Sequence, residues 1–170
     1  MWEAVIAAGG EFGIMPYGTE ALGTLRIEKG HVVIGPEADG RTTADDLGLG
    51  KLVSPAKWCV GKPLLNRPAL KAADRWQLVG LQTLDGAPMP RGAKIVADPD
   101  RAPPNPMLGH VTSWCWSPNL DAWIALALLA NGRARHGETL WAVSPLAGAR
   151  VRVRVGPPCF IDPDAERLRA

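Results

Sequence analysis

The sequence predicts an α+β chain in which short helices come first and an antiparallel β-barrel follows. The 19 glycines and 16 prolines are spread between short apolar runs, which is typical of strands joined by tight turns. Several such runs follow one another closely after residue 75. Before that point, the apolar spacing and the glycine stops are those of short helices.

A first helix is expected at the amino terminus. Residues 2–10 have Trp2, Val5 and Ile6 on one side and glycine at the end. Because no capping residue precedes this helix, we expect the natural chain to continue upstream. A domain cut there exposes apolar surface, which predicts self-association.

A second helix is predicted to run to about residue 29. Thr19 has the side chain of a cap, and Gly30 stands at the carboxyl end. The apolar side chains of Leu22, Leu25 and Ile27 are expected to point inward.

The stretch between the helices and the barrel carries weaker signals. Residues 31–35 are apolar and β-branched, so they read as a short buried strand. Thr43 and Asp46 have the spacing of a capping box, which predicts another short helix after them. Pro68 interrupts the apolar spacing of residues 62–74, so this part is interpreted as a linker with a helical turn.

The β part is predicted to begin with two hairpins. The first joins residues 76–84 to residues 93–96 through a turn at Asp85 and Gly86. The second joins residues 109–114 to the apolar residues 123–130. Residues 138–143 and 149–155 are the last predicted strands, and residues 156–170 read as an exposed tail.

Charge and cysteine usage exclude several classes of function. The 19 basic and 17 acidic side chains leave +2, too little for a nucleic-acid or anionic-membrane binder. The longest apolar run is far shorter than the roughly 20 residues that span a bilayer, and no basic cluster of a secretory signal is present, so a cytoplasmic protein is expected. Cys59, Cys115 and Cys159 lack disulfide-framework or zinc spacing and read as reduced thiols.

The sequence contains no self-contained catalytic motif. His31, His110 and His136 have no ligand partner at helical spacing, and no serine or cysteine lies in a nucleophile motif. The isolated chain is therefore expected to be inactive, with no catalytic residue of its own.

Two groups of side chains are candidate contact surfaces. The arginines of residues 149–155 alternate with valines, which is typical of a solvated strand face but also suits anionic groups or a partner subunit. Trp114 and Trp116 lie close to Trp123, and an exposed ring among them is suited to stacking on a flat ligand, whereas a buried one belongs to the core.

The order of short motifs resembles a known family. Residues 25–30 (Leu-Arg-Ile-Glu-Lys-Gly), 35–39 and 42–43 resemble the folate-binding aminomethyltransferases typified by the glycine cleavage T-protein. Residues 79–81, 86–89, 109–113 and 117–118 are similar, in the same order, to the carboxyl-terminal barrel of that family. Residues 16–22 and 158–163 most resemble the alpha subunits of heterotetrameric sarcosine oxidases.

The resemblance implies a division of the chain and a role. Residues 1–70 are expected to be the end of the folate-binding domain, a partial ferredoxin-like remnant, and residues 71–170 its Greek-key or jelly-roll-like barrel. The implied role lies in oxidative demethylation of sarcosine to glycine, where tetrahydrofolate captures the one-carbon unit and other sarcosine oxidase subunits are partners. FAD, FMN and NAD are expected only in the full complex. The upstream half with the catalytic carboxylate has no counterpart, so only a partial folate site is expected.

The side chains available for this site are Arg26, Glu28, Tyr17 and Trp114. A flat pterin requires stacking and hydrogen bonds, while a basic group meets its carboxylate tail. Arg26 and Glu28 lie about 200° apart on a helix, so at most one readily faces the ligand. Leu22 stands where the T-protein pattern has an arginine, so a T-protein-like clasp of the folate tail is not expected.

Two other functions fit the same resemblance and residues. The chain is also interpretable as part of a standalone aminomethyltransferase or folate-dependent demethylase, because these share the carboxyl-terminal region. The second alternative is a non-catalytic subunit-interaction module.

Overall fold

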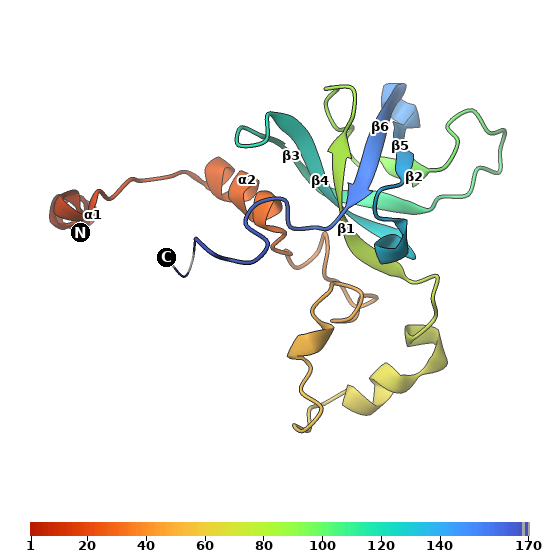
Figure 1. Cartoon of the computed structure of the whole chain (residues 1–170), viewed down its shortest axis with the longest axis horizontal. Helices are drawn as coiled ribbons and strands as arrows, with labels where there is room; N and C mark the ends of the chain where they lie inside the picture. Colours follow the sequence, from red (N-terminus) through yellow and green to blue (C-terminus); the bar gives the residue numbers. More distant parts are fainter. Residues whose placement is uncertain (168, 170) are drawn as a thin grey trace.

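The computed structural model describes residues 1–167 and 169, and its centre is a closed β-barrel (Figure 1). Within the described residues the antiparallel strands follow the order β1-β4-β3-β2-β5-β6, and β6 pairs with β1 to close the barrel. The predicted antiparallel barrel is confirmed. Its strands are β1 (Trp76–Thr83), β2 (Lys94–Val96), β3 (Gly109–Ser117), β4 (Ala122–Ala130), β5 (Thr139–Ser144) and β6 (Ala149–Gly156).

One predicted hairpin forms and the other does not. β3 and β4 pair as predicted, with Trp116 opposite Trp123. The predicted pairing of β1 with β2 is wrong, because β1 pairs with β4 and β6 whereas β2 lies between β3 and β5. β4 pairs with β1 from Trp76 to Gln82, a length of ladder that the short β2 does not offer.

β4 explains why the apolar run is continuous. Its alternate residues Ala125, Ala127 and Leu129 face the inner core of the barrel. The residues between them pack on the outer face in a second cluster, which contains Ile27, Leu78, Ile124, Leu126 and Leu128. A strand that is buried on both faces has no polar side, so its sequence shows no alternation.

Helix α2 (Thr19–Lys29) packs on the outer face of β3 and β4 (Figure 1). Gly30, with φ of +77°, ends it as predicted, but Thr19 is the first helical residue and makes no capping bond. Ile27 is buried as predicted. The prediction that Leu22 and Leu25 point inward is wrong, because only the last turn of α2 is buried and these two side chains are about half exposed.

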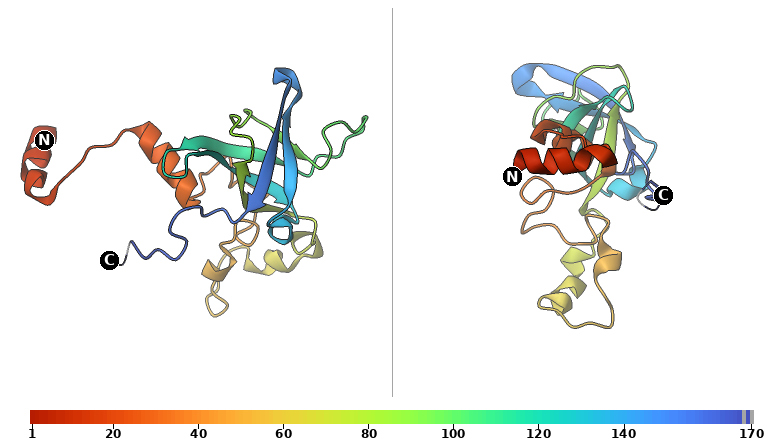
Figure 2. Two further views of the ribbon diagram at one scale, coloured as in Figure 1. Left: turned by 45° about the horizontal axis from the view of Figure 1, so that its top comes forward. Right: turned by 90° about the vertical axis from the view of Figure 1, so that its left-hand side faces the viewer.

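Helix α1 (Trp2–Gly9) forms as predicted and stands apart from the barrel in Figure 1 and in the left view of Figure 2. A single 3-10 turn (Gly10–Phe12) follows it. None of its residues is buried, and Trp2 is 66% exposed. Apolar surface at this end of the described chain therefore faces solvent.

The predicted strand at residues 31–35 is wrong. Gly35 has φ of +107° and turns the chain, and Ile34 makes only an isolated bridge to Ala38. Further on, Thr43 and Asp46 bond each other's backbone as a capping box, but turns and a 3-10 helix (Gly50–Leu52) follow in place of the predicted helix. The predicted linker with helical turns is present as two 3-10 helices (Lys62–Asn66 and Pro68–Leu70).

The segment after β6 is docked where an exposed tail was predicted. The backbone N–H groups of Phe160 and Ile161 both donate to the carbonyl oxygen of Glu28, at 2.9 and 3.1 Å. They satisfy a carbonyl that the helix end leaves without a partner. The prediction is therefore wrong for residues 158–162, where Phe160 also packs against the outer cluster. Among the described helices, none has the length and apolar character needed to cross a membrane.

Candidate functional site

A buried polar network around Glu37 joins α2 to the barrel. Glu37 lies in the turn after α2, and its side chain is fully buried. Its carboxylate accepts hydrogen bonds from the Arg26 guanidinium at 3.2 Å, from the Ser113 hydroxyl at 2.5 Å and from the Val33 backbone at 2.9 Å. Arg26 also donates to the Ser113 oxygen at 2.7 Å. These bonds compensate the cost of burying the charge, and they fix Arg26 on β3.

Glu28 forms a parallel network further along β3. It is 3% exposed and accepts hydrogen bonds from the Ser117 hydroxyl and from the Asn119 amide, the latter at 2.9 and 3.1 Å. The Ser117 oxygen in turn accepts the Leu120 backbone N–H at 3.2 Å. Glu28 therefore holds the β3–β4 turn against the end of α2.

The structure brings two of the four predicted site residues together. Arg26 and Glu28 both meet the outer face of β3, through Ser113 and Ser117. Trp114 packs against the inner core and lies on the opposite side of the strand, with the Arg91 guanidinium 5.9 Å above its ring. Tyr17 precedes α2 and is 67% exposed.

An open groove of about 520 Å³ runs along α2 beside these networks. The exposed Leu22 and Leu25 line one part of it, and Ile161 of the docked segment lines another. Lys29 and Arg167 add positive charge, and the Lys29 ammonium pairs with Asp162 at 3.3 Å. The groove combines apolar walls with a few charged groups, which is the usual character of a small-molecule site.

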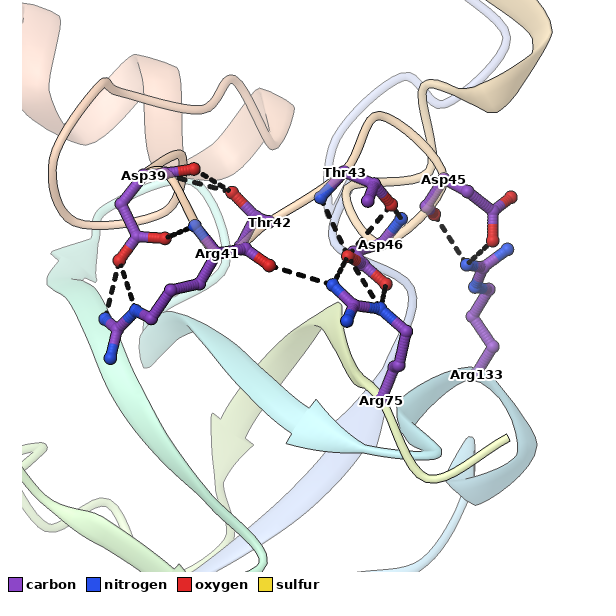
Figure 3. A network of polar contacts seen from close by, with 8 residues as sticks. All are labelled: Asp39, Arg41, Thr42, Thr43, Asp45, Asp46, Arg75 and Arg133. Carbon is purple, nitrogen blue, oxygen red and sulfur yellow. Dashed lines mark hydrogen bonds and ion pairs between the residues drawn. The ribbon is translucent and has the colours of Figure 1, made fainter. Parts of the chain in front are cut away.

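A further network holds residues 39–46 against the start of β1 (Figure 3). The Arg75 guanidinium donates to both carboxylate oxygens of Asp46, with Nε at 2.9 and 3.2 Å, and Thr43 donates to the same carboxylate. Burial alone raises the pKa of Asp46, but these hydrogen bonds outweigh it and leave the pKa below its usual range. Arg133 pairs with Asp45 at 3.1 Å beside it. The loop between α2 and the barrel is thus held by ion pairs.

The titratable side chains near these networks are suited to ligand binding and to structural support. Burial, together with the Glu28 carboxylate, raises the pKa of Cys115 to about 11, so its thiol is protonated at neutral pH. Burial also lowers the pKa of His110, whose ring packs edge-on against Trp76 at 4.9 Å. In the part of the chain that the structure describes, no three His, Cys, Asp or Glu side chains are grouped to hold a metal ion.

Sequence reasoning missed Glu37, Ser113, Ser117 and Asn119. Glu37 lies in residues 35–39, one of the motifs on which the resemblance rests. Its carboxylate follows the Gly35-Pro36 turn, 11 residues after Arg26, and this spacing could have indicated an ion pair. The serines and Asn119 carried no such signal, because they lie 87 or more residues from their partners on α2.

Comparison with known proteins matches both parts of the chain. The family described as the glycine cleavage T-protein C-terminal barrel domain matches residues 77–162, and the GCVT N-terminal domain matches residues 1–57. The chain is 46% identical over 168 residues to the sarcosine oxidase subunit alpha of Rhizobium meliloti (strain 1021). That match covers 98% of this chain and 17% of the subunit.

Two further relatives are aminomethyltransferases. The chain is 30% identical over 164 residues to the aminomethyltransferase of Bacteroides thetaiotaomicron, which covers 94% of this chain and 43% of the relative. The crystal structure of the glycine cleavage system aminomethyltransferase T from Bartonella henselae superposes with a TM-score of 0.71 at 23% identity. It covers 91% of this chain and 42% of that structure, and it shows the same fold.

Proposed function

The chain belongs to the glycine cleavage T-protein family, and on that premise we propose that it forms one wall of a tetrahydrofolate site in a sarcosine oxidase alpha subunit. The site serves the oxidative demethylation of sarcosine to glycine. The 46% identity with a sarcosine oxidase alpha subunit, against 30% with an aminomethyltransferase, supports the oxidase assignment. Because the chain spans 17% of that subunit, this proposal assigns catalysis to the larger assembly.

The groove beside α2 is the observation that carries the proposal. Leu22, Leu25 and Ile161 give apolar surface for the aromatic part of a folate, and Arg167 supplies positive charge for its carboxylate tail, whereas Lys29 is paired with Asp162. The groove is open on one side, as suits a wall whose opposite half comes from another part of the assembly. The residues present therefore fit the cofactor in chemical character.

Residues of this chain position the groove. Arg26 and Glu28 hold the end of α2 on β3, so they fix where Leu25 and Lys29 stand. Tyr17 is exposed ahead of α2 and offers a ring for stacking on the pterin. Tetrahydrofolate, when bound, is the acceptor of the one-carbon unit. In this proposal FAD, FMN and NAD are cofactors of the full complex only. The same proposal places the protein in the cytoplasm.

A titration tests the proposal. Calorimetry of the chain with tetrahydrofolate is expected to show saturable binding at one site. Leu25→Asp places a negative charge in the groove at a half-exposed position, so it is expected to weaken binding at least tenfold while the fold persists. Leu146→Asp is the matched control, because Leu146 is fully exposed in the turn between β5 and β6. Absence of binding, or equal loss in both variants, contradicts the proposal.

The standalone aminomethyltransferase is the second assignment, and the 30% identity with the Bacteroides relative over 164 residues supports it. A reconstituted full-length protein separates the two. Sarcosine-dependent reduction of a flavin supports the oxidase, whereas folate-dependent transfer without any flavin supports the aminomethyltransferase.

A further inference from the structure

Residues 47–73 concentrate positive charge that the rest of the chain does not neutralise. This segment contains Lys51, Lys57, Lys62, Arg67 and Lys71 and has no acidic residue. Within the described residues, the ion pairs all use other cations. The whole chain carries only +2, so the charge of this segment is a local feature.

The same segment projects away from the barrel and exposes large apolar side chains. In Figure 1 it is the orange to yellow part below β1, and both views of Figure 2 show it standing off the barrel. Leu52 and Trp58 are each 78% exposed, and Val60 is 88% exposed. Apolar side chains of this size are usually buried, so their gathering at a projecting loop indicates a contact surface.

Lys62 holds this loop in one conformation. Its ammonium group donates to the carbonyl oxygens of Ser54, Pro55 and Lys57, at 2.7, 2.6 and 2.7 Å. All three of its donors are therefore used within the loop that carries Trp58. A loop that is ordered before binding loses less conformational entropy when a partner covers it.

We propose that residues 47–73 are a docking surface for an acidic protein surface with an apolar pocket, carried by another subunit of the assembly. Trp58 enters the pocket, and the lysines and Arg67 form the charged rim around it. A central tryptophan within a polar, charged rim is the composition of a protein interface hot spot. The naming of the partner as a subunit rests on the proposed function, whereas the chemistry of the surface does not.

Other occupants fit less well. A second copy of this chain offers a weaker acidic complement, because within the described residues eight of its 17 acidic side chains, Asp39, Asp45 and Asp46 among them, already pair with its own cations. A nucleic acid needs cations that are free to meet phosphates, and one of the five cations of this segment, Lys62, is engaged by three carbonyl groups. The apolar tip has no role in phosphate binding. An acidic protein surface satisfies both the charge and the exposed tryptophan.

Cys59 provides the probe for a direct test, because it lies exposed between Trp58 and Val60. The chain labelled there with benzophenone maleimide is irradiated with the other subunits of the Rhizobium meliloti sarcosine oxidase, and separately with the remainder of its alpha subunit. Cross-linking to another subunit is expected. Cross-linking to the alpha remainder, or to nothing, overturns the proposal. A label carried by the double variant Cys59→Ser, Leu146→Cys is the control and is expected to give no cross-link.

Affinity measurements with the same subunits give a second readout. Trp58→Ala is expected to weaken binding at least about tenfold. Lys57→Glu with Lys71→Glu is expected to weaken it and to flatten its salt dependence. Arg101→Glu is the control and leaves binding unchanged, because Arg101 is an exposed cation outside residues 47–73. Tetrahydrofolate binding is expected to survive Trp58→Ala, so loss of docking and failure of the folate proposal are distinguishable. Trp58-dependent binding only to phosphatidylserine vesicles or duplex DNA overturns the proposal.

Discussion

Glu37 and Ser113 are 76 residues apart in the sequence, yet the serine hydroxyl donates to the Glu37 carboxylate at 2.5 Å. Their bond joins the turn after α2 to β3, and Arg26 contacts both residues. The ion pair of Arg26 and Glu37 lies within residues 1–57, and its hydrogen bonds to Ser113 join that part to the barrel, which matches the second family domain.

Removing Glu37 is predicted to destabilise the chain strongly. Glu37→Ala leaves the Arg26 charge and the Ser113 hydroxyl without their partner, a loss typical of broken buried pairs at about 3–5 kcal/mol. For a chain of this size the Tm is expected to fall by roughly 10 °C. Thermal denaturation followed by circular dichroism measures it. Glu11→Ala is the control at an exposed position, and equal Tm values for the two variants contradict the account.

The Asp46–Arg75 pair is predicted to make the free energy of unfolding depend on pH in the acidic range. The folded-state pKa of Asp46 lies below its ordinary value, so its contribution is present above the unfolded pKa of about 3.9 and is lost as the pH falls through the folded pKa. The difference in free energy of unfolding between wild type and Asp46→Asn is therefore expected to be full at pH 7 and to shrink below about pH 4. Urea unfolding across that range measures it, and a constant difference is the contrary result.

The absence of a side chain at Gly80 is predicted to leave the room that the docked segment after β6 occupies. A Cβ at this position meets the Pro157 carbonyl oxygen and comes within 2.7 Å of the Phe160 ring, so the segment has to move. Gly80→Ala is expected to cost about 1–3 kcal/mol and to speed amide exchange at Phe160 and Ile161. Gly23→Ala is the matched control, because a Cβ there has no neighbour within 4 Å and alanine favours the helix. Unchanged exchange in Gly80→Ala refutes the docking.

The three thiols are predicted to react at different rates. At pH 8 the exposed Cys59 reacts with Ellman's reagent first, whereas Cys115 reacts last because burial raises its pKa to about 11. Cys59→Ser is expected to remove the fast phase and leave the slow one. A fast phase that persists in this variant shows that another thiol is open.

Local signals were sufficient for some elements of the fold. α2 and its end at Gly30, the β3–β4 hairpin and the strand β6 all depend on residues near each other in sequence, and they were predicted. The partners of β1 were not predicted correctly, because the closure of the barrel depends on which distant strands match in length and in their apolar faces. The strand predicted at residues 31–35 was wrong for a related reason. The Val33 backbone N–H donates to the Glu37 carboxylate and is not available to a neighbouring strand.

The site was predicted less completely than the fold. The resemblance singled out Arg26 and Glu28, which lie on α2 and both contact β3, although helix geometry alone gave no reason to expect this. Trp114 faces the barrel interior because the bulge between Val111 and Ser113 shifts the register of β3. Such a shift has no signature in the sequence. The prediction that Leu22 and Leu25 point inward was wrong because nothing in the described chain buries that face of α2.

The most direct test of the folate wall is nuclear magnetic resonance of the nitrogen-15-labelled chain titrated with tetrahydrofolate. The account predicts saturable shifts of the backbone signals of Leu25, Asn119 and Ile161, which line the groove, while signals of β5 and β6 stay in place. If these signals do not move at saturating cofactor, or if only residues far from α2 respond, the chain does not carry a wall of a folate site.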